Sequence, residues 1–183
     1  MAFSTNAIAQ NPAKLAINQS SWTPSAVVPN GGSCAAPTAT LSPPTPIAYS
    51  GNNTGGTNSL DLMTVDACID PTFFGGASGP EDIYVFTPGP AASLTFSISG
   101  TGGFDPYIYL LSTCGNEGTC VAGSDDEGGV STPTFTYAAF TAGAPYYYYV
   151  DSFYAVGATG SVGPYTGTIS GTFPVSLTGF SID

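Results

Sequence analysis

After Gly79, the chain is a series of short runs rich in β-branched and aromatic residues, each bounded by Gly or Pro. Leu94, Phe96 and Ile98 alternate with polar residues, which is typical of a strand that has one face in a core. No segment has helical periodicity long enough to compete with this pattern. Seven runs predict strands: residues 82–87, 93–99, 106–112, 119–123, 133–137, 145–151 and 164–172. We therefore expect an all-β fold, an antiparallel β-sandwich.

The beginning of the chain has a different character. Residues 10–56 are rich in Pro and Ala and show little sustained alternation, apart from residues 14–22 and 26–28, each of which suits an extended edge strand. We expect residues 1–60 to form an extended amino-terminal arm that includes at most a first edge strand. Residues 61–183 are expected to form the sandwich.

The charge of the chain is strongly one-sided. Twelve acidic residues stand against one basic residue, Lys14, and give a formal net charge of −11. Nucleic acids and anionic lipid surfaces are bound mainly through Lys and Arg, so we expect neither as a partner. A membrane-spanning helix needs about 20 predominantly apolar residues. The longest uncharged stretch is interrupted by Pro, Asn, Ser and Gly, so no membrane insertion is expected.

The four cysteines have no CxxC spacing and the chain has no histidine. This combination is unfavourable for a zinc site and favours disulfides in an oxidising compartment. We therefore expect a secreted protein, extracellular or at the cell surface. Three pairings are open. We predict Cys114 with Cys120, because a hairpin brings them together, and Cys34 with Cys68 by elimination.

The same hairpin predicts a metal site. With its tip near Asn116, strand pairing places Asp105 opposite Glu127, at the other end from the cysteines. Several carboxylates gathered there would repel one another unless a hard cation lay between them. We predict calcium bound by Asp105, Asp125, Asp126 and Glu127. The alternative is an ordinary turn, because Asp and Gly are also common turn residues.

Little catalytic chemistry is open to this chain. Without histidine, Ser-His-Asp and Cys-His arrangements and histidine general bases are excluded. A glycosidase needs only two carboxylates, but Glu81, Glu117 and Glu127 have no basic or histidine residue to support them. We expect a protein that is not an enzyme.

Four consecutive tyrosines, residues 146–149, must point alternately to the two faces of a strand. One hypothesis is an aromatic binding face for a sugar ring or an extended polymer, formed by Tyr146, Tyr148, Phe153 and Tyr154. The alternative is a central strand whose inner tyrosines fill the core and whose outer tyrosines are covered by a loop.

Six segments together resemble the bacterial pre-peptidase C-terminal domain: residues 81–86, 93–100, 104–111, 122–129, 146–151 and 164–169. The resemblance extends over about residues 79–171, in matching order and spacing. It implies a secreted, non-catalytic sandwich of jelly-roll type. Relatives in clostridial collagenases bind calcium and collagen, which strengthens Asp105, Asp125 and Asp126 as calcium ligands.

Two functions are consistent with these features. The first is an extracellular structural subunit that assembles with copies of itself into a fibre (filament) or surface layer, because an extended, nearly uncharged arm suits strand addition to a neighbour. The second is a calcium-stabilised module that binds an extracellular polymer, such as a collagen-like protein or a glycan, and accompanies secreted hydrolases. The first is preferred.

Overall fold

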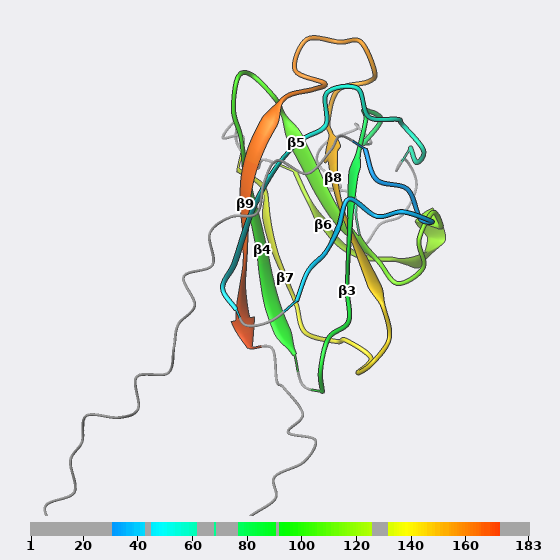
Figure 1. Cartoon of the computed structure of the whole chain (residues 1–183), viewed down its shortest axis with the longest axis vertical. Coiled ribbons are helices and arrows are strands. Elements are labelled where there is room, and N and C mark those ends of the chain that lie inside the picture. Colours follow the sequence, from blue (N-terminus) through cyan, green and yellow to red (C-terminus); the bar gives the residue numbers. More distant parts are fainter. Residues whose placement is uncertain are drawn as a thin grey trace, which may run out of the picture.

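The computed structural model describes residues 31–42, 45–61, 68, 77–90, 92–125 and 132–172. Within them the chain forms two sheets packed face to face (Figure 1). The expected β-sandwich is confirmed.

The five-stranded sheet has the order β1-β3-β8-β5-β6. Its strands are β1 (Ala39–Thr40), β3 (Asp82–Phe86), β8 (Tyr146–Ser152), β5 (Pro106–Leu111) and β6 (Cys120–Ser124). All neighbours in it are antiparallel except β1 and β3, which are parallel. A one-turn 3-10 helix, η1 (Glu117–Thr119), lies between β5 and β6.

The four-stranded sheet is antiparallel throughout and has the order β2-β9-β4-β7. Its strands are β2 (Ile47–Asn52), β9 (Pro164–Thr172), β4 (Ser93–Gly100) and β7 (Thr134–Tyr137). In β4 the alternation is complete: Leu94, Phe96 and Ile98 are buried and the residues between them are not. All seven runs expected to be strands are strands, with bounds within about two residues.

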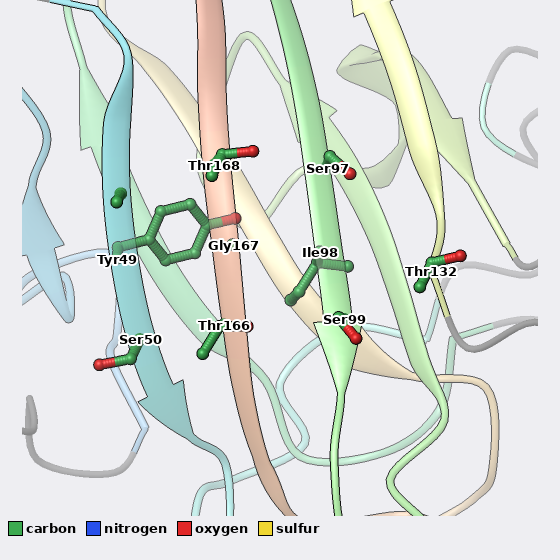
Figure 2. A pocket seen from close by; sticks show the side chains of 10 residues that line it. Tyr49, Ser50, Ser97, Ile98, Ser99, Thr132, Thr166, Gly167 and Thr168 are labelled. Carbon is green, nitrogen blue, oxygen red and sulfur yellow. The ribbon is translucent and has the colours of Figure 1, made fainter.

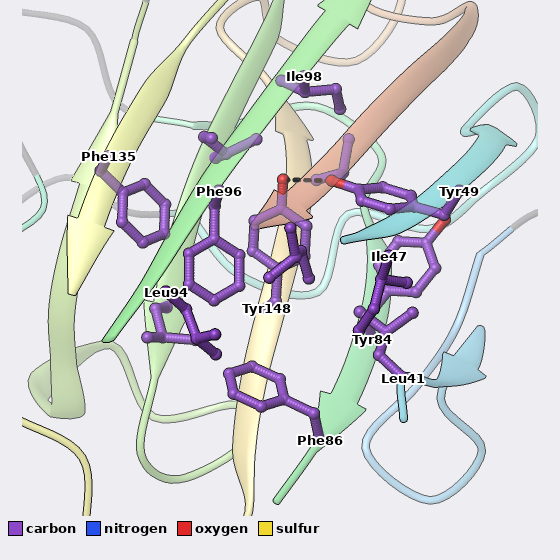
Figure 3. Close-up of a cluster of buried hydrophobic side chains, with 14 of the residues drawn as sticks. Leu41, Ile47, Tyr49, Tyr84, Phe86, Leu94, Phe96, Ile98, Phe135 and Tyr148 are labelled. Carbon is purple, nitrogen blue, oxygen red and sulfur yellow. Dashed lines mark hydrogen bonds between the residues drawn. The ribbon is translucent and has the colours of Figure 1, made fainter. Parts of the chain in front are cut away.

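The core between the sheets is largely aromatic (Figure 3). Phe96 stacks on Phe135 with ring centroids 4.9 Å apart, and packs against Tyr148 of the other sheet at the same distance. The hydroxyl of Tyr49 donates a 2.7 Å hydrogen bond to that of Tyr148, which joins β2 to β8 through the core. Buried tyrosines are favourable only when the hydroxyl finds a partner, and this pair provides one.

A second, smaller cluster covers the other face of the five-stranded sheet. It includes Ile83, Tyr109 and Tyr149, together with Cys68 and Cys120. All six residues of β5 are therefore buried. A strand covered on both faces carries a continuous apolar run rather than an alternating one, which explains the sequence of residues 106–111.

Both sheets take an edge strand from the segment expected to be an arm. β1 pairs with β3, and β2 pairs with β9 along its whole length. Asn53 is fully buried, and its side chain bonds to Pro80 O, Ser161 O and the Gly163 amide. The division expected at residue 60 is therefore corrected: the sandwich already includes residues 38–41 and 47–53. Residues 1–30 lie outside the described part.

Candidate interaction surfaces

All four cysteines form disulfides, but with other partners than expected. Cys34 is bonded to Cys114 and Cys68 to Cys120, with Cα atoms 5.6 and 6.1 Å apart. The predicted pairing of Cys114 with Cys120 is wrong, because a register shift after Leu110 places Leu111 opposite Cys120. η1 then fills the tip of the hairpin. Both disulfides instead tie an earlier segment to the β5–β6 hairpin.

The hairpin register bears on the calcium prediction. Ile108 pairs with Ser124, in agreement with the register used to predict Asp105 opposite Glu127. Asp105 lies just before β5 and Asp125 just after β6, so both are at the same end of the strand pair. Asp126 and Glu127 lie outside the described residues. Among the described residues no group of three or more His, Cys, Asp or Glu side chains could hold a metal ion. Calcium binding remains a prediction.

The tyrosines of β8 do not form a binding face. Tyr146 and Tyr148 are buried in the core between the sheets. Tyr149 points to the opposite face, where its hydroxyl accepts a 3.0 Å hydrogen bond from the Gly115 amide and lies 3.1 Å from Cys114 Sγ. The alternative interpretation is confirmed: β8 is a central strand whose outward Tyr149 is covered by the loop that the Cys34–Cys114 disulfide closes.

Phe153 and Tyr154 lie in the β8–β9 loop, drawn in orange at the top of Figure 1. Their rings are edge to face, with centroids 5.2 Å apart, and Tyr154 is 41% exposed. Val156 and Val162 are also exposed in this loop. Among the described residues, these three are the exposed large hydrophobic side chains. Of the predicted aromatic set, Tyr154 is therefore exposed, and Phe153 is half-buried against the second cluster.

Three carboxyl groups, those of Glu81, Asp82 and Asp151, are about 1% exposed or less, and a fourth, that of Asp125, is 7% exposed. Asp151 accepts hydrogen bonds from the Gly79 and Ser152 amides and from the Tyr109 hydroxyl. Burial, and then the nearby Glu81 carboxylate, raise the pKa of Asp151 well above its ordinary range. Burial also raises the pKa of Glu81, despite its hydrogen bonds from Ser59, and Glu81 Oε2 has no hydrogen-bond partner among the described residues.

Asp82 is the third buried carboxyl group. It accepts hydrogen bonds from the Tyr165 hydroxyl and the Gly31 amide, and burial raises its pKa. Through these hydrogen bonds, the three carboxyl groups connect β3 and β8 to Gly31, Ser59, Gly79 and β9. Since each is about 1% exposed or less, none is accessible to a substrate.

One edge of the four-stranded sheet is formed by β2. Within the described residues, β2 pairs only with β9. Its inward residues Ile47 and Tyr49 are 6% and 7% exposed, whereas Leu94 and Phe96 of the central β4 are fully buried. Both side chains are therefore slightly less covered than those of the central strand. An unpaired edge also presents a row of free amide and carbonyl groups, which can pair with another chain.

The fold is similar to that of a pre-peptidase C-terminal domain. The solved structure of this domain from a Bacillus anthracis collagenase is 15% identical and has a TM-score of 0.41, over 78% of this chain and 97% of that domain. PliG of Aeromonas hydrophila, a periplasmic inhibitor of g-type lysozyme, is 10% identical and has a TM-score of 0.44, over 73% of this chain and 95% of that one. No family model matches the chain, and no match was found among curated proteins. No residue role follows from these likenesses.

Sequence reasoning missed two features, the edge strand β2 and the buried carboxyl groups. The β2 strand had a detectable signal, the alternation of Ile47, Ala48, Tyr49 and Ser50. The buried carboxyl groups had none, because Asp and Glu are usually exposed. In the part of the chain that the structure describes, no helix has the length and apolar character required to span a bilayer.

Proposed function

We propose that this chain is a secreted, non-catalytic structural subunit that assembles with copies of itself by strand addition. The amino-terminal segment of one subunit, residues 10–29, pairs with the β2 edge of the next. Repetition of this heterologous contact builds an open filament rather than a closed ring.

The observation that carries the proposal is the edge of β2, which pairs with no second strand among the described residues. An added strand would extend the four-stranded sheet to five strands and would lie beside Ile47 and Tyr49, which are 6% and 7% exposed, whereas Leu94 and Phe96 of the central strand are fully buried. Main-chain hydrogen bonds supply the affinity in this mode of recognition, and alternate side chains supply the specificity.

The amino-terminal segment suits the role of donor. Its only charged residue is Lys14, so it brings no carboxylate to a subunit of net charge −11. The described chain begins at Gly31, whose amide bonds to Asp82 and whose backbone lies against Gly56, a few residues beyond the end of β2. Thirty extended residues span up to about 100 Å, enough to reach a neighbouring subunit.

Two further features support the non-catalytic and secreted parts of the proposal. The chain contains no histidine, and Glu81, Asp82 and Asp151 are buried away from any substrate. Two disulfides are formed, and disulfides persist mainly in oxidising compartments outside the cytosol.

Electron microscopy and light scattering of the full chain, compared with a variant lacking residues 1–29, test the proposal. We expect filaments from the full chain and monomers from the shortened one, with the same far-ultraviolet circular dichroism from the sandwich. Filaments from both proteins, or monomers from both at every concentration, would contradict assembly through this segment.

A further inference from the structure

The outward face of the four-stranded sheet carries rows of hydroxyl groups in register. Ser50 of β2 lies opposite Thr166 of β9, which lies opposite Ser99 of β4. The next row, two residues along each strand, contains Ala48, Thr168, Ser97 and Thr134. Neighbouring strands are about 4.8 Å apart and the rows are roughly 6.7 Å apart.

These two rows line a depression of about 490 Å³ that extends across the sheet from Ala48 and Ser50 to Thr132. Figure 2 shows the small side chains of both rows along its length. A volume of this size is within the range of ligand-binding sites. The described residues that line it are small, apart from Tyr49 and Ile98, which are buried in the core.

The depression is free of charge in a strongly charged molecule. None of the four strands of this sheet contains Asp, Glu, Lys or Arg, although the chain has a net charge of −11. An anionic polymer would find no base to pair with and would be repelled by the molecule as a whole. A cationic ligand would find no carboxylate on these four strands. The face is therefore matched to a neutral ligand.

Ser and Thr hydroxyl groups both donate and accept hydrogen bonds, as sugar hydroxyl groups do. At the β4–β7 boundary the hydroxyls bond to one another, with 3.0 Å between Ser97 Oγ and Thr134 Oγ1. Thr166 and Thr168 are exposed on β9, in the middle of the depression, and their outward hydroxyl groups are placed to bond to a ligand.

We propose that this depression binds a neutral polysaccharide, which lies across the strands along the two hydroxyl rows. The concave shape favours a narrow chain over the flat face of a second subunit. This site lies on a sheet face and does not depend on the strand addition proposed above, which uses the edge of β2 and its main-chain groups.

The test is a saturation-transfer nuclear magnetic resonance titration, which observes the ligand and therefore also works with filaments of the full-length protein. The neutral probes are cellohexaose, laminarihexaose and mannohexaose, and anionic hexagalacturonate is the control. We expect millimolar binding of at least one neutral hexasaccharide and none of hexagalacturonate. Thr166→Val/Thr168→Val removes two hydroxyl groups and keeps the shape of both side chains. We expect it to weaken binding about tenfold.

The matched control is Ser170→Ala/Thr172→Val, which removes two exposed hydroxyl groups of the same strand outside the depression. Its affinity should equal that of the unmodified protein. The proposal is overturned if no neutral hexasaccharide binds, if the Thr166/Thr168 variant binds as well as the unmodified protein, or if hexagalacturonate binds equally. The proposal is also overturned if no sugar binds and light scattering shows dimers in the unmodified protein that are lost only in the Thr166/Thr168 variant. That result would assign the face to contact with a second subunit. Because the amino-terminal segment is intact in every variant, filament formation is scored independently.

Discussion

The ring of Tyr49 lies against Gly167, the residue opposite it in the β2–β9 ladder. A Cβ atom at position 167 would be 2.2 Å from Tyr49 Cζ. Two residues along, the arrangement is reversed: Gly51 lies opposite Tyr165, and a Cβ at position 51 would be 2.2 Å from the Tyr165 hydroxyl. Each glycine therefore makes room for the tyrosine of the facing strand, and the two tyrosines hold β2 on the core.

We predict that Gly167→Ala destabilises the protein by about 1–3 kcal/mol, because the added methyl group displaces the Tyr49 ring from a packed core. Urea unfolding measures the change. In a Tyr49→Ala background, Gly167→Ala should lower the free energy of unfolding by a smaller amount, since the tyrosine ring is absent. Gly118→Ala, where the nearest contact is the 3.3 Å approach to the Asn116 side chain, is the control. An equal cost of Gly167→Ala in both backgrounds would refute the packing explanation.

The strands of the sandwich could be predicted from the sequence because their signals are local. The alternation in residues 93–99 and the apolar run in residues 106–111 each reflect the strand's own burial. β2 was missed because Pro43, Pro44 and Pro46 precede it and Gly51 and Asn52 end it, so six residues of alternation stand among loop residues. β1 has only two residues, too few for any pattern.

The candidate surfaces depend on relationships between distant residues, which composition and spacing do not specify. The observed pairing of Ile108 with Ser124 agrees with the register predicted for Asp105 and Glu127, but that register continued toward the tip would place Cys120 opposite Ser112, and the shift after Leu110 places it opposite Leu111, so neither brings it to Cys114. Likewise, a run of four tyrosines is equally compatible with a core strand and an exposed one. Only the packing of both faces of β8 decides between them.

Stability should decrease as the pH rises from the acidic range. Burial raises the pKa of Glu81, Asp82 and Asp151 in the folded state, so the folded state retains protons that the unfolded state releases near pH 4. Unfolding therefore releases protons, and the free energy of unfolding falls as the pH rises from about 4 through the raised pKa values. Urea unfolding at pH 5 and pH 8 should show the higher midpoint at pH 5.

Asp151→Asn isolates one of these groups, because the amide oxygen still accepts from the Gly79 and Ser152 amides. We expect a weaker pH dependence in this variant. A urea midpoint that rises between pH 5 and pH 8 would show that the three carboxyl groups are ionised in the folded protein. An unchanged pH dependence in Asp151→Asn would show this for Asp151.

The disulfide pairing is directly testable by peptide mapping under non-reducing conditions. We expect linked peptides that contain Cys34 with Cys114 and Cys68 with Cys120. The first bond joins residues 80 apart in the sequence, and a loop of that length corresponds to about 4 kcal/mol of stability in the chain-entropy model. Cys34→Ser/Cys114→Ser should therefore unfold at clearly lower urea concentration. A peptide linking Cys114 to Cys120 would be inconsistent with the structure.

Calcium, if it binds at Asp105 and its predicted partners, should raise the melting temperature, because a ligand of the native state stabilises it by mass action. Calorimetry in millimolar calcium and in chelator measures the difference. Asp105→Asn should reduce the calcium response, and Glu117→Gln, on η1 outside the predicted set, should not. Identical melting temperatures in calcium and chelator would support the ordinary-turn alternative.

Hydrogen exchange at β2 tests the central proposal most directly. In the full-length protein we expect the amides of Ile47–Asn52 that do not bond to β9 to become protected as protein concentration increases, because each subunit then receives a strand from another. In the variant lacking residues 1–29 these amides should exchange rapidly at every concentration. Two results would contradict the proposal. Protection that is the same at all concentrations in the full chain would mean that the amino-terminal segment pairs within its own subunit. Protection that persists in the shortened variant would mean that the amino-terminal segment does not pair with β2.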